Sequence, residues 1–162
     1  MSKTLYIVRH AKSSWNDTKL KDWERPLLKI GIERANKISK ILKRKKIHPD
    51  KIISSHAFRA LNTAVIFSLA LDYSVDDIEI RYDIYGKKPS NILNLIKKQD
   101  DSVSSLMIFG HNPVFTDLYN LLTGGKIENL STSAVACIRF EIDRWNKIQT
   151  KKGKSMFIET GK

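Results

Sequence analysis

Short apolar segments alternate with amphipathic segments along most of this sequence, and this alternation limits the fold more than any other feature. Apolar runs rich in β-branched residues predict strands at residues 5–8, 52–55, 78–83, 106–109, 134–142 and 155–159. Apolar residues at helical spacing predict helices at residues 31–46, 57–70, 90 onward and 113–122. This order predicts an α/β fold, a three-layer α/β/α sandwich around a mostly parallel sheet.

Helix starts and one long loop carry further signals. Ser90 is expected to cap the third helix, because its hydroxyl can accept a hydrogen bond from a free backbone N–H group. Asn112 followed by Pro113 predicts the start of the fourth helix, with asparagine as the cap and proline at the first helical position. Residues 11–28 follow neither period and predict a long surface loop, a kind of segment that often carries function.

The size and charge of the chain set broader limits. Its 162 residues fit one domain, 1–162, without an internal repeat or a linker. The 29 Lys and Arg against 17 Asp and Glu give a net charge of +12, which favours an anionic partner. The single cysteine, Cys137, excludes an intramolecular disulfide and is expected to be a buried free thiol. No apolar stretch is long enough for a signal peptide or a membrane span, which predicts a cytoplasmic protein without a membrane partner.

Charged and imidazole side chains recur where the predicted strands end. Arg9 and His10 follow the first strand, Arg59 follows the second, and Asp83 and His111 end the third and fourth. Ligands of parallel sheets bind at this edge, so these groups are expected to share one crevice. Each of these residues alone has an ordinary explanation, such as a surface ion pair or a structural histidine. Together they indicate a site that binds an anion. His48 and His56 are interpreted as solvated residues.

A phosphoryl group is the anion that suits this set. Arginine offers a planar fork of donors that matches phosphate oxygens, and helix N-termini near Ala57 and Asn112 add backbone N–H groups. A neutral imidazole can attack phosphorus, and positive charge around the equatorial oxygens stabilises the transfer. The residues therefore favour phosphoryl chemistry.

Four segments, in order, resemble the histidine phosphatase superfamily of phosphoglycerate-mutase-like proteins. The resemblance is greatest to the small SixA-type phosphohistidine phosphatases, and it spans nearly the whole chain, from residue 4 to about residue 136. The segments are Leu5-Tyr6-Ile7-Val8-Arg9-His10-Ala11, Arg25-Pro26-Leu27 before Gly31, Ser54-Ser55-His56-Ala57-Phe58-Arg59-Ala60 with Thr63-Ala64, and Ile108-Phe109-Gly110-His111-Asn112-Pro113.

The resemblance implies a role for each matching residue. His10 would be the nucleophile and form a transient phosphohistidine, while Arg9, Arg59 and His111 would bind the phosphoryl oxygens. Asp83 stands where many relatives have an acidic proton donor. No metal and no cofactor are implied. Second candidates for the rim of the phosphate site are Arg25, Ser13, Ser14 and Asn16.

Two residues depart from the pattern of the superfamily. Ala11 replaces the glycine of the usual Arg-His-Gly triplet, which is acceptable if its backbone keeps a negative φ. Asp83 is shorter than the glutamate of relatives that cleave phosphoesters. A phosphoramidate substrate would need less from such an acid, because imidazole leaves more readily than an alkoxide.

A short chain has little room for an inserted lid, and an open site suits a phosphorylated protein. We therefore expect hydrolysis of phosphohistidine on a protein such as a phosphotransfer domain, releasing phosphate, with the basic surface attracting an acidic partner. One alternative is the same chemistry on small phosphomonoesters. Another is a non-catalytic module that binds phosphoproteins or nucleic acid through residues 43–46, although these lack the aromatic residues and the motif expected for nucleic acid.

Overall fold

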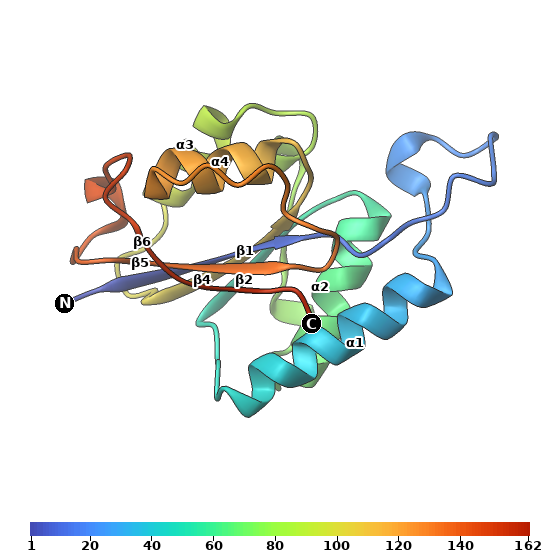
Figure 1. Ribbon diagram of the computed structural model, residues 1–162, viewed down its shortest axis with the longest axis horizontal. Coiled ribbons are helices and arrows are strands. Elements are labelled where there is room, and N and C mark those ends of the chain that lie inside the picture. The colour runs from blue at the N-terminus through green and yellow to red at the C-terminus, as the bar shows by residue number, and fades with distance from the viewer.

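The computed structural model describes residues 1–162 and contains one six-stranded sheet with two long helices on each face (Figure 1). The strands are β1 (Lys3–Arg9), β2 (Lys51–Ser55), β3 (Glu79–Arg81), β4 (Ser105–Gly110), β5 (Val135–Phe140) and β6 (Lys154–Glu159). The α-helices are α1 (Lys29–Arg44), α2 (Phe58–Ala70), α3 (Pro89–Lys97) and α4 (Val114–Thr123). Short 3₁₀ helices are η1 (Asp22–Glu24), η2 (Val75–Asp77), η3 (Tyr82–Ile84) and η4 (Trp145–Lys147).

The sheet is mostly parallel, which confirms the predicted fold class. Its strand order is β3-β2-β4-β1-β5-β6. The first four of these strands pair in parallel, whereas β5 runs antiparallel to both β1 and β6. Because β1 and β4 are parallel neighbours with Arg9 opposite Gly110, the residues that follow them leave the sheet at the same edge.

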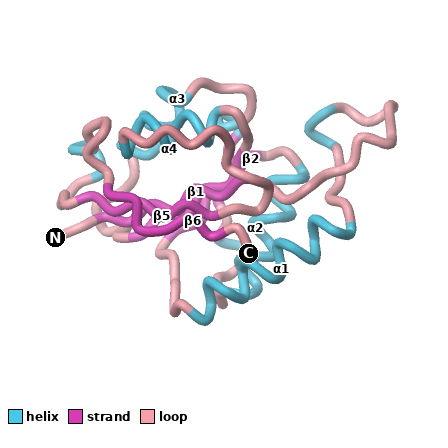
Figure 2. Tube along the Cα trace, viewed as in Figure 1, coloured by secondary structure: helices cyan, strands magenta, loops and turns pink.

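Alternation along the central strand divides the core between the two faces of the sheet. Leu5 and Ile7 belong to the apolar cluster that includes residues of α3 and α4. Tyr6 and Val8 point to the other face and pack with residues of α1 and α2. Figure 2 shows the resulting three layers, with α3 and α4 on one side of the strands and α1 and α2 on the other.

Several element boundaries differ from the sequence prediction. Ser90 lies inside α3, whose cap position is Lys88, and Pro113 rather than Asn112 holds the cap position of α4. Asn112 still serves this helix, because its Oδ1 accepts a hydrogen bond from the Thr116 N–H at 3.2 Å. The predicted strand 78–83 is shorter, since the chain turns into η3 and buries Ile84 in the core.

The loop after β1 stands out from the sheet edge at the right of Figure 1 and returns to α1. A bridge between Ser13 and Leu27 joins its two arms. Gly31 permits the close packing of α1 on this loop, because a Cβ there would lie 2.3 Å from the Lys12 carbonyl oxygen. Cys137 is buried, as predicted. None of the helices combines the length and the apolar character needed to span a bilayer.

Candidate active site

The ends of β1 and β4 bring two histidines together. The His10 N–H donates to the Gly110 carbonyl oxygen at 3.0 Å, and the rings of His10 and His111 lie 5.4 Å apart between centroids. Gly110, at the end of β4, leaves room for the Phe115 ring, since a Cβ at this position would lie 2.4 Å from it. The tertiary structure thus confirms the predicted convergence of the strand ends.

A cleft of about 550 Å³ opens over this pair of histidines. It contains most of the predicted site residues and several that were not predicted as site residues, including Asn112, which the sequence marked only as a helix start. The predicted members are Arg9, His10, Ser13, Asn16, Arg25, Arg59 and His111. The additional members are Lys12, Trp15, Asp22, Leu28, Asn112 and Thr132.

His10 is held as a neutral imidazole with one nitrogen free. Its Nδ1–H donates to the Ala11 carbonyl oxygen at 2.7 Å, and because a carbonyl only accepts, Nε2 keeps its lone pair. Burial lowers the pKa of His10 to about 4, with smaller contributions from the charges of Arg59 and Arg9. A neutral imidazole with a free lone pair can act as a nucleophile at neutral pH.

Ala11 fits the position that is usually glycine. It is fully buried, and it is not among the residues with positive φ, which confirms the condition set by the sequence. Its N–H donates to the Thr63 hydroxyl at 2.9 Å, and that hydroxyl donates to the Arg59 carbonyl oxygen at 2.6 Å. These bonds fix the end of β1 against the first turns of α2, so His10 and Arg59 are held by one connected framework.

His111 is held by β2. Its Nε2 shares a hydrogen bond with the Ser55 hydroxyl at 2.8 Å, and the same oxygen accepts from the Ala57 N–H at 3.2 Å. Burial, followed by the charge of Arg59, lowers the pKa of His111 to about 3. His111 is therefore neutral near pH 7 and is suited to hydrogen bonding rather than to carrying charge.

The three arginines approach the cleft from different elements. Arg9 at the end of β1 donates through Nη1 to the Leu130 carbonyl oxygen at 3.0 Å, and its buried Nε has no partner. Arg59 on α2 is also buried, and Arg25 is fixed in the loop by the Ser13 hydroxyl and by the Ser14 carbonyl oxygen. Their planar donor groups form a strongly positive cradle for an oxyanion.

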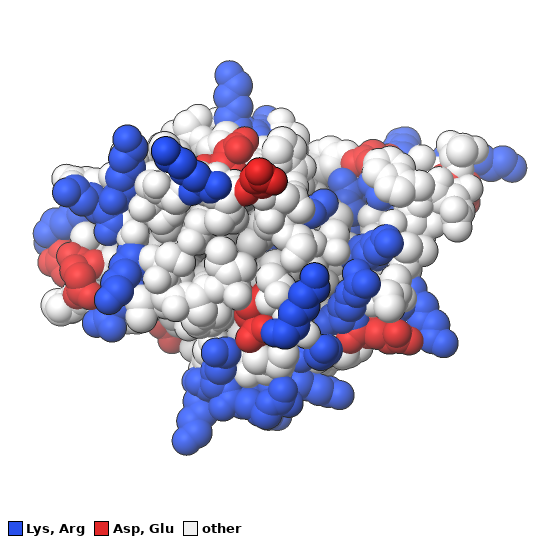
Figure 3. Space-filling view, in the orientation of Figure 1, with Lys and Arg blue, Asp and Glu red and all other residues white.

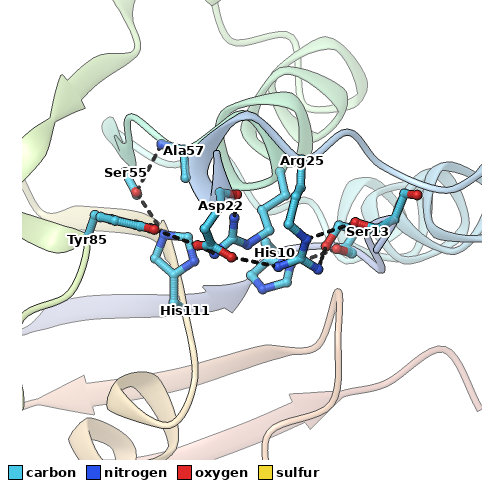
Figure 4. Close-up of polar contacts among 11 residues, drawn as sticks. His10, Ser13, Asp22, Arg25, Ser55, Ala57, Tyr85 and His111 are labelled. Atoms are coloured by element: carbon cyan, nitrogen blue, oxygen red, sulfur yellow. Dashed lines mark hydrogen bonds and ion pairs between the residues drawn. The ribbon is translucent and has the colours of Figure 1, made fainter. Parts of the chain in front are cut away.

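Asp22 is the principal residue that sequence reasoning missed. Its carboxylate accepts hydrogen bonds from Arg25 at 3.0 Å, from Arg59 at 2.9 Å and from the hydroxyl of Tyr85 (Figure 4). Burial opposes its ionisation, but the bonds from Tyr85, Arg25 and Arg59 hold the pKa of Asp22 well below its usual range. Asp22 lies in a segment without periodicity, and no sequence signal marks it.

The structure does not bring Asp83 into the cleft. Its carboxylate pairs with Arg81 at 2.6 and 3.0 Å and lies in a separate hollow with Lys87. Hydrogen bonds from Arg81 lower the pKa of Asp83, so the group is anionic and half exposed. Asp83 lies outside the cleft because the strand ends at Arg81 and Asp83, in η3, pairs with that arginine. The role of Asp83 as a proton donor stays a prediction.

His48 is exposed, as the sequence indicated, but His56 is not a free surface residue. Its ring stacks on Tyr82 at 4.4 Å, and its Nδ1 is buried without a partner. Burial lowers the pKa of His56. The prediction of a solvated side chain was wrong because neighbouring aromatic rings, which come from distant segments, cover it.

The arrangement is suited to transfer of a phosphoryl group. It combines a neutral imidazole that has a free nitrogen with arginine donors that can stabilise charge on phosphoryl oxygens. No three His, Cys, Asp or Glu side chains gather closely enough in this chain to hold a metal ion. The site thus places a neutral imidazole beside the donor groups of the arginines.

Comparison with known proteins agrees with this geometry. The sequence model of the histidine phosphatase superfamily (branch 1) matches residues 5–84. An uncharacterised chloroplastic protein of Arabidopsis thaliana is 31% identical over 155 residues, which cover 91% of this chain and 71% of that protein.

Solved structures extend the match across the fold. The proposed phosphohistidine phosphatase SixA from Agrobacterium tumefaciens superposes with a TM-score of 0.81 at 24% identity and covers 97% of both chains. A protein histidine phosphatase SixA in complex with tungstate gives a TM-score of 0.83 at 18% identity, covering 98% of this chain and 97% of that one. These structures show the same fold, and the match to the sequence model and to the relative at 31% identity shows that the present chain belongs to the histidine phosphatase superfamily.

Proposed function

We propose that this protein is a phosphatase that hydrolyses phosphohistidine on a protein substrate through a covalent intermediate on His10. The observation that carries the proposal is the fixed tautomer of His10, whose Nδ1–H is bound to the Ala11 carbonyl oxygen while Nε2 is free beside the arginine donors. Membership of the histidine phosphatase superfamily supports phosphatase activity in general. The choice of phosphohistidine on a protein as the substrate goes beyond this membership and rests on the arguments below.

The reaction has two steps. In the first, the lone pair of His10 Nε2 attacks phosphorus, and the bond between phosphorus and the substrate nitrogen breaks. The substrate imidazole keeps that electron pair and takes a proton from solvent. In the second step, a water oxygen attacks phosphorus and loses a proton to solvent, the bond to His10 breaks with its electron pair returning to Nε2, and inorganic phosphate leaves. Arg9, Arg59 and His111 bind the phosphoryl oxygens in both steps, with Arg25, Ser13 and Asn16 at the rim of the cleft.

The carboxylates favour a phosphoramidate over a phosphoester. Asp22, the carboxylate in the cleft, is held anionic by its arginine and tyrosine partners, and Asp83 lies outside the cleft. An alkoxide leaving group needs a proton from an acid in the transition state, whereas imidazole is a better leaving group. Similarity of the fold to structures named as SixA supports the same choice, and tungstate, bound in one of them, is a suitable probe for the phosphoryl position.

Mass spectrometry of the rapidly quenched enzyme tests the proposal. The enzyme is mixed with a phosphotransfer protein phosphorylated on histidine and is kept at alkaline pH to protect an acid-labile adduct. We expect a phosphate on His10 that appears and then turns over, and the His10→Ala variant should give neither adduct nor release.

Parallel assays with sugar phosphates and nucleotides separate the substrate classes. Faster turnover of these esters than of the phosphoprotein would replace the proposal by a phosphatase of small phosphomonoesters. Full phosphate release by the His10→Ala variant would refute the covalent mechanism.

A further inference from the structure

A second surface feature lies beside the cleft and has no part in the proposed chemistry. It is a shallow hollow of about 460 Å³, here called the aromatic patch, and no Lys, Arg, Asp or Glu side chain lines it. In a chain in which 28% of the residues are charged, a hollow of this composition is unusual. The residues of the aromatic patch are Trp23, His56, Phe58, Leu61, Ile80 and Tyr82.

The aromatic patch leaves large apolar side chains in contact with water. The exposed fraction is 42% for Phe58, 47% for Ile80 and 73% for Tyr82. Grouped exposed apolar residues of this kind mark interaction sites more often than isolated ones do. Aromatic side chains are also the residues that dominate the energy of protein interfaces.

The rings of the aromatic patch are positioned before any partner arrives. Trp23 meets the edge of Phe58 at 5.5 Å, and His56 stacks on Tyr82 at 4.4 Å between centroids. They come from η1, from the turn between β2 and α2, from the first turn of α2 and from η3, so they hold one another across segments distant in sequence. Preformed contact surfaces lose less conformational entropy on binding.

The aromatic patch lies next to the catalytic cleft. The ring of Tyr85 stands edge-on to His56 at 5.2 Å and edge-on to His111 at 5.4 Å, so one ring separates the two sites. Two consecutive residues also lie one in each site, since Asp22 lines the cleft and Trp23 lines the aromatic patch. A macromolecule that places its phosphoryl group on His10 would bring the surface around that group close to the aromatic patch.

The geometry points to the aromatic patch as the docking site for the protein that carries the phosphohistidine, through an apolar side chain next to that histidine. This inference rests on the proposed function and names the surface that distinguishes a protein substrate from a small one. Stable dimers bury roughly 20–30 residues on each side, whereas the aromatic patch offers six, which suits one anchor of a transient partner.

Charge at the border of the aromatic patch specifies the partner further. The Lys21 ammonium lies 5.8 Å from the centroid of the Trp23 ring. A carboxylate of the partner that lies beside its apolar anchor would pair with this ammonium. The expected partner surface is therefore apolar with an acidic neighbour, in keeping with the net charge of +12 of this chain.

Two substrates that share the same bond test the inference. One is a phosphotransfer protein phosphorylated on histidine, and the other is N-phosphoimidazole, which is too small to reach from the cleft to the aromatic patch. For the double variant Phe58→Ser, Tyr82→Ser, we expect kcat/KM to fall about tenfold or more on the phosphoprotein. Turnover of N-phosphoimidazole should stay within about twofold of the wild type, because both side chains lie outside the cleft.

A matched control uses the same helix. Leu69 on α2 is 66% exposed and lies outside the aromatic patch, so Leu69→Ser removes a comparable apolar group elsewhere. The single variant Tyr82→Ser, at the most exposed position of the patch, guards against misfolding of the double variant. Lys21→Gln should weaken the dependence of phosphoprotein turnover on salt concentration.

Each other outcome overturns the inference. Unchanged turnover of the phosphoprotein by the double variant would show that the aromatic patch does not dock it. Equal losses on both substrates would show that the patch only supports the cleft, and an equal loss in Leu69→Ser would show a general surface effect. A wild-type enzyme that cleaves N-phosphoimidazole but not the phosphoprotein would refute the proposed function, and the docking role with it.

Discussion

Asp22 already occupies arginine donors that an incoming phosphoryl group needs. Its carboxylate and its carbonyl oxygen accept from both terminal nitrogens of Arg59, at 2.9 and 2.7 Å, and its second carboxylate oxygen accepts from Arg25 at 3.0 Å. A phosphoryl oxygen that binds the same fork displaces the carboxylate. The variant Asp22→Asn, which keeps the shape but removes the charge, should therefore bind anions more tightly.

The size of this effect follows from the contacts. Hydrogen bonds to charged groups contribute about 1.5–3 kcal/mol each when buried, whereas exposed ion pairs contribute about 0–1 kcal/mol. The side chain of Asp22 is 44% exposed, while that of Arg59 is only 7% exposed. The free energy contributed by this ion pair is therefore expected to lie between the two ranges. Releasing the competition is expected to gain about 1.5 kcal/mol, or about a tenfold lower Kd.

Isothermal titration calorimetry with tungstate and with inorganic phosphate measures this change directly. Asp143→Asn is the matched control, because it removes the same charge from an ion pair with Lys147 that lies outside the cleft. An equal gain in the control would assign the effect to net charge. Unchanged or weaker binding by Asp22→Asn would refute the reasoning and show that Asp22 instead holds Arg59 in place for the anion.

Three further predictions concern the buried histidines, Asp83 and Gly31. Because the pKa values of His10 and His111 are lowered to about 4 and about 3, the unfolded chain takes up protons first as pH falls below 6.5. The free energy of unfolding, measured by denaturant titration, should therefore be lower at pH 5 than at pH 7 by about 2 kcal/mol or more. The double variant His10→Gln, His111→Gln should lose this dependence. Asp83→Asn should change turnover of phosphohistidine and of phosphoesters less than about threefold, since it lies outside the cleft; a selective loss on esters would restore the acid role. Gly31→Ala should lower stability by about 1–3 kcal/mol in thermal denaturation, because its Cβ would meet the Lys12 carbonyl oxygen at 2.3 Å, and an unchanged Tm would contradict this packing.

The charged surface illustrates what composition predicts. Figure 3 shows Lys and Arg side chains spread over the visible face and gathered along its lower edge, where α1 lies. The sequence predicted this basic character and its amphipathic helix, because charge counts and helical spacing are local properties. The partner of that surface depends on shape, which a count of charges does not contain.

Local pattern was sufficient for the central strands. Leu5-Tyr6-Ile7-Val8 is apolar at every position, as a strand covered on both faces requires, and Arg9 and His10 follow it directly. Because ligands bind at the carboxyl edge of a parallel sheet, the sequence was sufficient to predict that His10, Arg59 and His111 lie together. The place of Asp83 outside the cleft has a local cause, since the chain turns into η3 directly after Arg81 and Asp83 pairs with that arginine.

The sequence alone determined the order of strands and helices, the mostly parallel sheet and the strand-end residues that meet in the cleft. The tertiary structure decided which further side chains join these residues in the cleft. Asp22 meets Arg59 and Tyr85 across separations of 37 and 63 residues, and no periodic pattern encodes contacts between a loop and distant elements. The tertiary structure also decided the tautomer and pKa of His10, because both depend on burial and on neighbouring charges that exist only after the chain has folded.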